Sequence, residues 1–272
     1  MATTAAIVAA SAQAQDSPVD LGTLILSGGL TPVEADAYGR SSTVITAEEI
    51  EARGITTVQD ALRAVPGVAV NSSGGNFTQV RIRGGEGNHT LILIDGVEAA
   101  GGDSEYILSG LETANIERIE VLRGPQSVFY GSNASAGVIN IITRKGGLGE
   151  EIRTTGEAGG CLTATAFYSR RNEKGGISLS FSEARDDGWD FSGDGGEKDG
   201  PDRRTIILNG DYLITPDLKL GFTLRDSNEE YDFDSTDGGA ATFEGYVVDD
   251  ATQFGERDEL TASIYAELST LD

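Results

Sequence analysis

Apolar and polar residues follow two different patterns along this chain, and the change falls near residue 147. Between residues 41 and 146, short apolar runs alternate with stretches of helical periodicity. Beyond residue 147, short segments alternate apolar with polar or small residues and are separated by Gly, Asp and Asn. The first pattern predicts a small α/β unit, and the second predicts β-strands with two unlike faces.

Two short helices are expected in the first region. Thr46 and Glu49 have the spacing of a capping box, and Gly54 is a stop signal for that helix. A second helix begins at Thr57 and ends at Pro66, because proline lacks an amide and restricts the residue before it. Its buried face is expected to consist of Val58, Ala61, Leu62 and Val65, which recur at helical spacing.

Short β-branched runs predict the strands of a compact mixed sheet in the same region. Residues 79–83 alternate apolar with polar, and residues 91–94 read as a buried strand followed by an Asp95-Gly96 turn. Further strands are expected at residues 119–122 and 138–143. From periodicity alone, a soluble α/β domain of another role is an open alternative.

The second region predicts six strands, at residues 151–160, 162–171, 176–185, 203–214, 218–227 and 259–268. Their alternation fits barrel strands that place apolar residues toward lipid and polar residues toward the lumen. An ordinary soluble antiparallel sheet with one wet face fits it too. Aromatic residues near the strand ends could join interfacial girdles, namely Tyr168, Phe181, Trp189, Tyr212 and Phe222.

Composition narrows the function classes. The formal net charge of -24, from 44 acidic and 20 basic residues, argues against a nucleic-acid partner, since phosphates require basic patches. A single cysteine, Cys161, excludes an internal disulfide framework. A single histidine, His89, argues against a histidine zinc site or a catalytic triad.

The N-terminus has part of a secretory signal. A short apolar stretch ends in Ala12-Gln13-Ala14, which fits a signal-peptidase site, although no basic residue precedes it. A disordered Ala-rich tail is the alternative. The sequence has no apolar run of about 18 residues, so a membrane role would have to use strands.

Five blocks in order carry a family resemblance: SSTVITAEEIEARG, VQDALRAVPGV, VRIRG, LILIDGV and IERIEVLRGPQSVFYGSNASAGVINIITRKG. Together they resemble the plug domain of TonB-dependent outer-membrane receptors. The resemblance implies an α+β plug domain followed by antiparallel transmembrane β-barrel strands, which gates uptake of a scarce solute. Complete barrels of this kind have about 22 strands, so we expect a truncated barrel of about six strands with an open edge. The implied division is a signal peptide at 1–14, a TonB box and linker at 15–40, the plug at 41–147 and barrel strands at 148–272.

The resemblance also implies partners and site residues. The segment before the plug is similar to a TonB box, with Thr23, Leu24, Ile25, Leu26 and Ser27 as its core. The periplasmic protein TonB would bind it by strand addition, and a short edge strand is the alternative. Family arginines at IRG and LRGP latch the plug to acids on the barrel wall, which corresponds here to Arg81, Arg83 and Arg123. Local pairing with Glu117 or Glu120 is equally consistent with the sequence.

The acidic loops suggest a ligand class. They resemble the early external loops of vitamin B12 (cobalamin) receptors, whose aspartates bind calcium, and the matching candidates are Asp190, Asp199, Asp202, Asp232 and Asp249. Calcium takes six to eight oxygen ligands, so these carboxylates suit it, although acidic loops are also simply solvated. Calcium is the one cofactor considered, and none is required.

The predicted function is energised uptake of cobalamin across the bacterial outer membrane, with a ferric siderophore as the alternative ligand. The partners would be TonB, the ligand and outer-membrane lipid. An enzyme is not expected, because the sequence NASAG around Ser135 lacks the first glycine of a nucleophile elbow. A soluble binding module derived from the plug is a further alternative.

Overall fold

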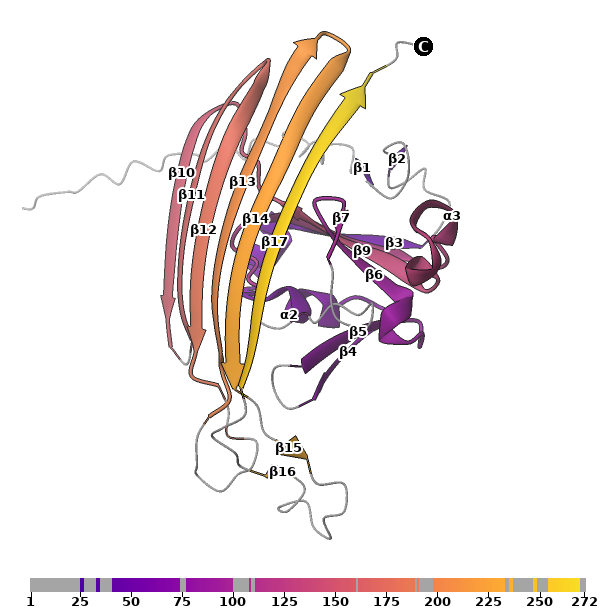
Figure 1. Cartoon of the computed structure of the whole chain (residues 1–272), viewed down its shortest axis with the longest axis vertical. Coiled ribbons are helices and arrows are strands. Elements are labelled where there is room, and N and C mark those ends of the chain that lie inside the picture. Colours follow the sequence, from indigo (N-terminus) through magenta and orange to yellow (C-terminus); the bar gives the residue numbers. More distant parts are fainter. Residues whose placement is uncertain are drawn as a thin grey trace, which may run out of the picture.

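The computed structural model describes residues 25–26, 33–34, 41–73, 77–99, 108, 111–159, 161–188, 190, 198–232, 235–236, 247–248 and 254–269. Residues 41–143 form a mixed α/β body, which we call the plug. It lies against one face of a sheet of six long strands, which we call the wall (Figure 1). The predicted signal segment lies outside the described residues, as does Trp189.

Both predicted helices of the plug are present. α1 (Ala47–Ala52) follows Thr46, and α2 (Val58–Arg63) follows Thr57; each threonine hydroxyl accepts a hydrogen bond from the amide three residues later at 3.3 Å. Such caps satisfy amides that have no partner within the helix. Gly54 follows α1 with a φ of +61°, which glycine adopts without a Cβ clash.

The plug sheet is mixed, as predicted. It contains β3 (Ser42–Thr46), β8 (Ile116–Arg123), β9 (Gly137–Thr143), β6 (Thr90–Ile94) and β7 (Val97–Glu98), in that spatial order. β6 and β9 are parallel, and the other pairs are antiparallel. β4 (Val68–Ser73) and β5 (Phe77–Ile82) form a separate hairpin. The short elements are β1 (Ile25–Leu26), β2 (Val33–Glu34), η1 (Gly87–His89), α3 (Ser127–Tyr130), η3 (Ser132–Ala134), β15 (Ser235–Thr236) and β16 (Val247–Val248).

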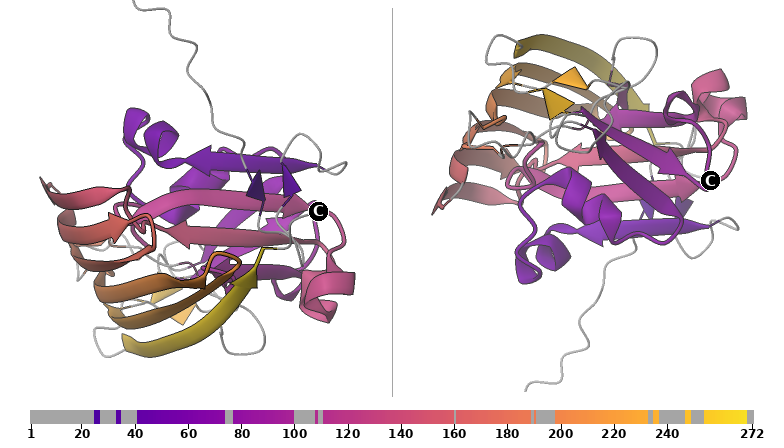
Figure 2. Two further views of the ribbon diagram at one scale, coloured as in Figure 1. Left: turned by 90° about the horizontal axis from the view of Figure 1, so that it is seen from above. Right: turned by 90° about the horizontal axis from the view of Figure 1, so that it is seen from below.

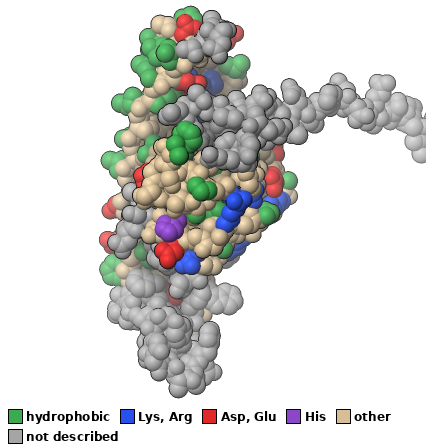
Figure 3. Space-filling model, turned by 90° about the vertical axis from the view of Figure 1, so that its right-hand side faces the viewer, with side chains coloured by type: hydrophobic (Ala, Val, Ile, Leu, Met, Phe, Trp, Pro, Cys, Tyr) green, Lys and Arg blue, Asp and Glu red, His purple; other side chains and the backbone are tan. Residues whose placement is uncertain are grey.

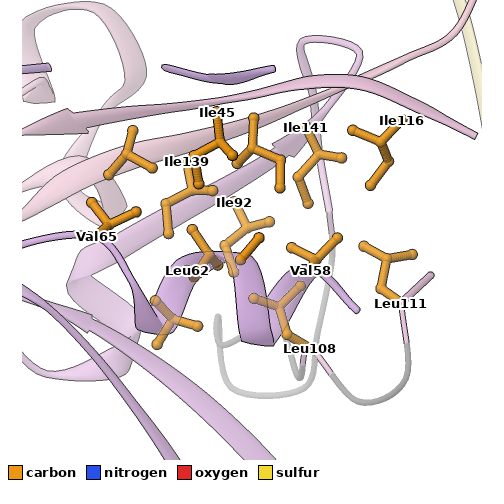
Figure 4. Packing of buried hydrophobic residues seen from close by; sticks show 14 of the residues in the cluster. Ile45, Val58, Leu62, Val65, Ile92, Leu108, Leu111, Ile116, Ile139 and Ile141 are labelled. Atoms are coloured by element: carbon orange, nitrogen blue, oxygen red, sulfur yellow. The ribbon is translucent and has the colours of Figure 1, made fainter. Parts of the chain in front are cut away.

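Apolar residues fill both sides of the plug sheet. On one side α2 packs beneath the strands, and Val58, Ala61 and Leu62 of its apolar face are fully buried (Figure 4). A smaller cluster contains Leu91, Leu93, Leu122, Ala134 and Val138. Because both faces are covered, β6 is a continuous apolar run rather than an alternating one.

The wall is an antiparallel sheet in which each strand pairs with the next one along the chain. Its strands are β10 (Gly149–Ala158), β11 (Cys161–Asn172), β12 (Gly175–Asp186), β13 (Pro201–Thr215), β14 (Leu218–Asp232) and β17 (Phe254–Leu268). These are the six strands that the sequence predicted. The described strands form an open sheet that curves around one side of the plug (Figure 2).

Burial in the wall is the reverse of a soluble sheet. The face toward the plug buries small hydroxyl side chains: Thr165, Ser169, Ser178, Ser180, Ser182, Thr205, Thr223 and Ser227. The opposite face exposes large apolar side chains: Leu162, Ile177, Leu179, Ile206, Leu220, Phe222, Leu224 and Ile264. Polar-in and apolar-out alternation is the pattern of a barrel strand in lipid.

The plug surface and the outer face of the wall carry different kinds of side chain. Figure 3 shows the plug surface with mixed polar and charged side chains, including His89, and hydrophobic side chains along the outer side of the wall at the left. Within the part of the chain that the structure describes, each helix is too short or too polar to cross a membrane.

Candidate functional site

The plug meets the wall along an interface that carries the candidate functional contacts. A cavity of about 390 Å³ opens between α1, segment 112–116 and the strands β10 and β11. Glu51, Arg144 and Arg153 lie at its rim, where Glu51 Oε1 is 3.5 Å from Arg144 and 3.3 Å from Arg153. The Glu51 and Arg153 side chains are largely exposed, so these ion pairs hold the plug weakly.

A second, much smaller cavity of about 30 Å³ lies along the same interface. Glu112, Asn115 and Ile116 of the plug line both cavities. The wall side of the smaller cavity is formed by residues of β12, β13 and β14, including the fully buried Arg225. One plug segment therefore separates an open cavity from a buried, charged part of the wall.

The wall charges at this place are paired with one another. Arg203 lies 2.9 Å from Glu229, Arg257 lies 2.5 Å from the same carboxylate, and Arg225 lies 2.9 Å from Glu259. Buried charges need such partners, because desolvation would otherwise make them very costly.

Glu112 is a carboxylate of the plug near these paired charges of the wall. Burial raises the pKa of Glu112, and the positive charge of Arg203 opposes that shift without cancelling it. The environment of Glu112 therefore favours its neutral form.

The end of β9 makes a buried polar contact with the wall. Asn209 of β13 donates a hydrogen bond from Nδ2 to Thr143 Oγ1 at 3.1 Å. The connection from β9 to β10 continues this contact, since Lys145 lies over the Tyr265 ring at 5.5 Å from its centroid. Gly146 has a φ of +78°, and a Cβ there would collide with Ser169 Oγ.

The three arginines of the predicted latch lie in the plug, with contacts inside it. Arg123 donates to Pro66 O at 2.5 Å and to Ser42 O at 3.0 Å, and Arg81 donates to Gln79 at 3.0 Å. Arg83 approaches Gly67 and Gly124. Glu117 and Glu120, the alternative partners, both form ion pairs with Arg118. The latch of Arg81, Arg83 and Arg123 to barrel acids stays a prediction.

The other predicted site residues are only partly described. Ile25 and Leu26 form β1, which pairs with β2, whereas Thr23, Leu24 and Ser27 lie outside the described residues. Asp199 is buried, Asp190 is half-buried, Asp202 and Asp232 are exposed, and Asp249 lies outside the described part. Within the described ranges, no group of three or more metal-binding side chains comes together. The TonB box and the calcium site stay predictions.

Sequence reasoning missed the residues that join the plug to the wall. The alternating pattern of β13 predicts that Asn209 lies on the polar face of the strand. Its partner Thr143 is 66 residues earlier, and no local pattern links the two residues. Glu112 likewise lies in a segment with no motif of its own.

Comparisons with known proteins agree with this geometry. The family model for the TonB-dependent Receptor Plug Domain matches residues 35–138. The siderophore receptor PirA from Acinetobacter baumannii is 21% identical over 82% of this chain and 37% of that chain, with a TM-score of 0.61. A variant of the ferric enterobactin receptor PfeA from Pseudomonas aeruginosa, in complex with enterobactin, is 25% identical over 71% of this chain and 33% of that chain, with a TM-score of 0.55.

The ferripyoverdine receptor of the outer membrane of Pseudomonas aeruginosa, bound to ferripyoverdine, is 15% identical over 90% of this chain and 34% of that chain, with a TM-score of 0.69. This chain thus spans 33% to 37% of the length of these three solved structures.

Fold and sequence together define the class of protein. A plug domain packs on the polar face of strands whose other face is apolar, as in a plugged barrel. Residues 35–138 thus form a TonB-dependent receptor plug domain, and six antiparallel strands follow it.

Proposed function

We propose that this protein takes part in the uptake of a ferric siderophore across the bacterial outer membrane. The observation that carries the proposal is the plug domain on a polar-in, apolar-out wall. The ligand class is supported by the ferric enterobactin receptor, which matches at 25% identity over 71% of this chain. The cobalamin prediction has no such support in these comparisons, so the siderophore alternative takes its place.

The contacts suggest how the plug would serve uptake. A packed plug core beside a hydroxyl-lined wall closes the space that the wall curves around, while the polar contacts between them can be broken more readily than the core. TonB would add a strand at residues 23–27 and pull on the plug from its N-terminal side. The outward apolar side chains of the wall would face outer-membrane lipid.

Iron uptake by cells that produce the receptor tests the proposal. The probes are radiolabelled ferric enterobactin and ferripyoverdine, supplied to a host without its own receptors for them. We expect saturable uptake of at least one probe that depends on TonB. If neither probe binds to the cell surface and neither is taken up, the proposal is rejected.

The TonB partnership has a separate test. Leu24→Pro removes an amide and fixes φ, so strand addition should fail and uptake should cease while surface binding continues. Leu30→Pro, just outside the predicted core, is the matched control and should leave uptake near the wild-type rate. Equal loss of binding and uptake in Leu24→Pro would show that this segment is structural.

Cobalamin is a distinct outcome of the binding experiment. Calorimetry with cyanocobalamin, with and without calcium, should show no binding if the siderophore proposal is correct. Calcium-dependent binding that is lost in the Asp190→Asn, Asp232→Asn double variant would instead support a cobalamin receptor with ordered acidic loops.

A further inference from the structure

A chain of hydrogen bonds runs from the wall into the plug. Thr223 Oγ1 donates to Asn209 Oδ1 at 2.7 Å, Asn209 Nδ2 donates to Thr143 Oγ1 at 3.1 Å, and Thr143 Oγ1 donates to Asp95 Oδ2 at 2.6 Å. The Thr143 amide also donates to Asp95 Oδ1 at 2.9 Å. The chain thus links β14, β13, β9 and the turn between β6 and β7.

The direction of each bond follows from the chemistry of its groups. The Thr143 hydroxyl donates its hydrogen bond to Asp95 Oδ2. Its lone pairs then face the amide nitrogen of Asn209, which leaves Asn209 Oδ1 to accept from Thr223. Thr143, Asn209 and Thr223 are all at least 95% buried, so each lost bond would leave a buried polar atom without its partner.

The hydrogen-bond chain ends in the plug at Asp95, in the turn between β6 and β7. Asp95 has a φ of +51°, a left-handed conformation that is unfavourable for most residues with a Cβ. Its two hydrogen bonds from Thr143 offset that cost and give a reason for aspartate rather than glycine at this position. The adjoining Gly96 amide donates to Asn140 Oδ1 at 3.2 Å, which ties the turn to β9 a second time.

The place of this hydrogen-bond chain in the fold suggests that it holds one end of the plug. Thr143 is the last residue of β9, and the next five residues lead into the wall at β10. Toward the N-terminal end of the plug, β3 is the edge strand of the plug sheet within the described residues, and the Glu51 side chain of α1 is largely exposed. The buried hydrogen bonds therefore hold the C-terminal end of the plug, and the Glu51 ion pairs join α1 to Arg144 beside that end and to Arg153 of β10.

We propose that Asp95, Thr143, Asn209 and Thr223 form the fixed anchor of the plug on the wall, with Asp95 and Asn209 as positioning residues. The anchor keeps the C-terminal end of the plug in register with β13 and β14. Its consequence for transport rests on the proposed function: a pull from the N-terminal side would load β3 and α1 while the anchor stays in place.

Hydrogen exchange of the purified protein in detergent, without ligand, tests the anchor. Thr143→Val removes the hydroxyl at similar volume, and Thr143→Ser retains it. We expect the amides of Asp95, Gly96 and Thr143 to exchange about tenfold faster in Thr143→Val, the effect of roughly one buried hydrogen bond. Thr143→Ser should restore protection to within about twofold of wild type.

Thr90→Val is the matched control, because the Thr90 hydroxyl is buried in the neighbouring strand and has no hydrogen-bond partner in the described structure. It should leave exchange unchanged. Equal exchange in Thr143→Val and Thr90→Val would overturn the proposal.

A double-variant cycle separates an anchor from a bond inside the plug. Thr143→Val and Asn209→Leu should be non-additive, since each breaks the same contact between plug and wall. Additive effects would show that Thr143 acts only through Asp95 and would overturn the anchor. Because no ligand is used, a failure of siderophore uptake would leave this measurement intact.

Discussion

The plug and the wall bury opposite kinds of residue. The plug encloses isoleucine, leucine and valine around α2. The wall turns its large apolar side chains outward, and the plug covers the hydroxyl side chains on its other face. The plug is therefore stabilised by its own apolar core, and the outer face of the wall has the composition of a strand face that contacts lipid. The two bodies meet through a largely polar interface and not through one shared apolar core.

The largest effect is expected in the plug core. Leu62→Ala removes a fully buried side chain and should lower the free energy of unfolding of the plug by about 2–5 kcal/mol. Val128→Ala, at a position with 91% exposure, is the control and should change it by less than about 0.5 kcal/mol. Denaturant dependence of exchange at the β9 amides measures both, and similar values would contradict the assigned core.

A charge on the outer face of the wall should come next. Leu224→Arg should destabilise the protein in lipid vesicles by up to about 2–4 kcal/mol, because an arginine at the bilayer midplane loses its hydration. Asn228→Arg, on the same face of β14 but within a polar group with Arg204 and Asp258, should cost far less. Urea unfolding in vesicles compares them, and equal values would mean that the outer face is not in lipid.

Local patterns predicted the elements of both bodies. The hydroxyls of Thr46 and Thr57 marked the helix starts, Pro66 marked an end, and the alternation beyond residue 147 gave the strands of the wall. These signals succeed because capping and strand alternation depend on neighbours within a few residues.

The interface could not be predicted in the same way. Asn209 meets Thr143 only because β13 and β9 come together in space, and that juxtaposition has no signature within either strand. The bonds described for Arg81 and Arg123 lie inside the plug, and their latch to barrel acids stays a prediction. A basic residue in an acidic protein has many potential partners, so its charge alone does not identify the one it binds.

A smaller, pH-dependent effect is expected at Glu112. Because burial raises its pKa, neutral Glu112 is favoured beside Arg203, Arg225 and Glu229, and its stabilising contribution is lost as the pH rises through the raised pKa. Glu112→Gln imitates the neutral form, so it should be more stable than wild type at pH 8, and the difference should disappear by about pH 4.

Melting temperatures at several pH values measure this difference. Glu117→Gln is the control, since that carboxylate is half-exposed and pairs with Arg118. A Glu112→Gln variant that is less stable than wild type at pH 8 would show that attraction to the wall arginines exceeds the cost of burial.

The most direct test of the central claim is the accessibility of alternate residues along β14 in lipid vesicles. Nitroxide labels on single cysteines, in a Cys161→Ser background, would replace Leu220, Phe222 and Leu224 on the outer face and Thr223 and Ser227 on the inner face. We predict high contact with lipid-dissolved oxygen at the three outer positions and low contact at the two inner ones. Equal oxygen contact on both faces, or greater contact at Thr223 and Ser227, would contradict a wall that holds the plug on its polar side and faces lipid on the other.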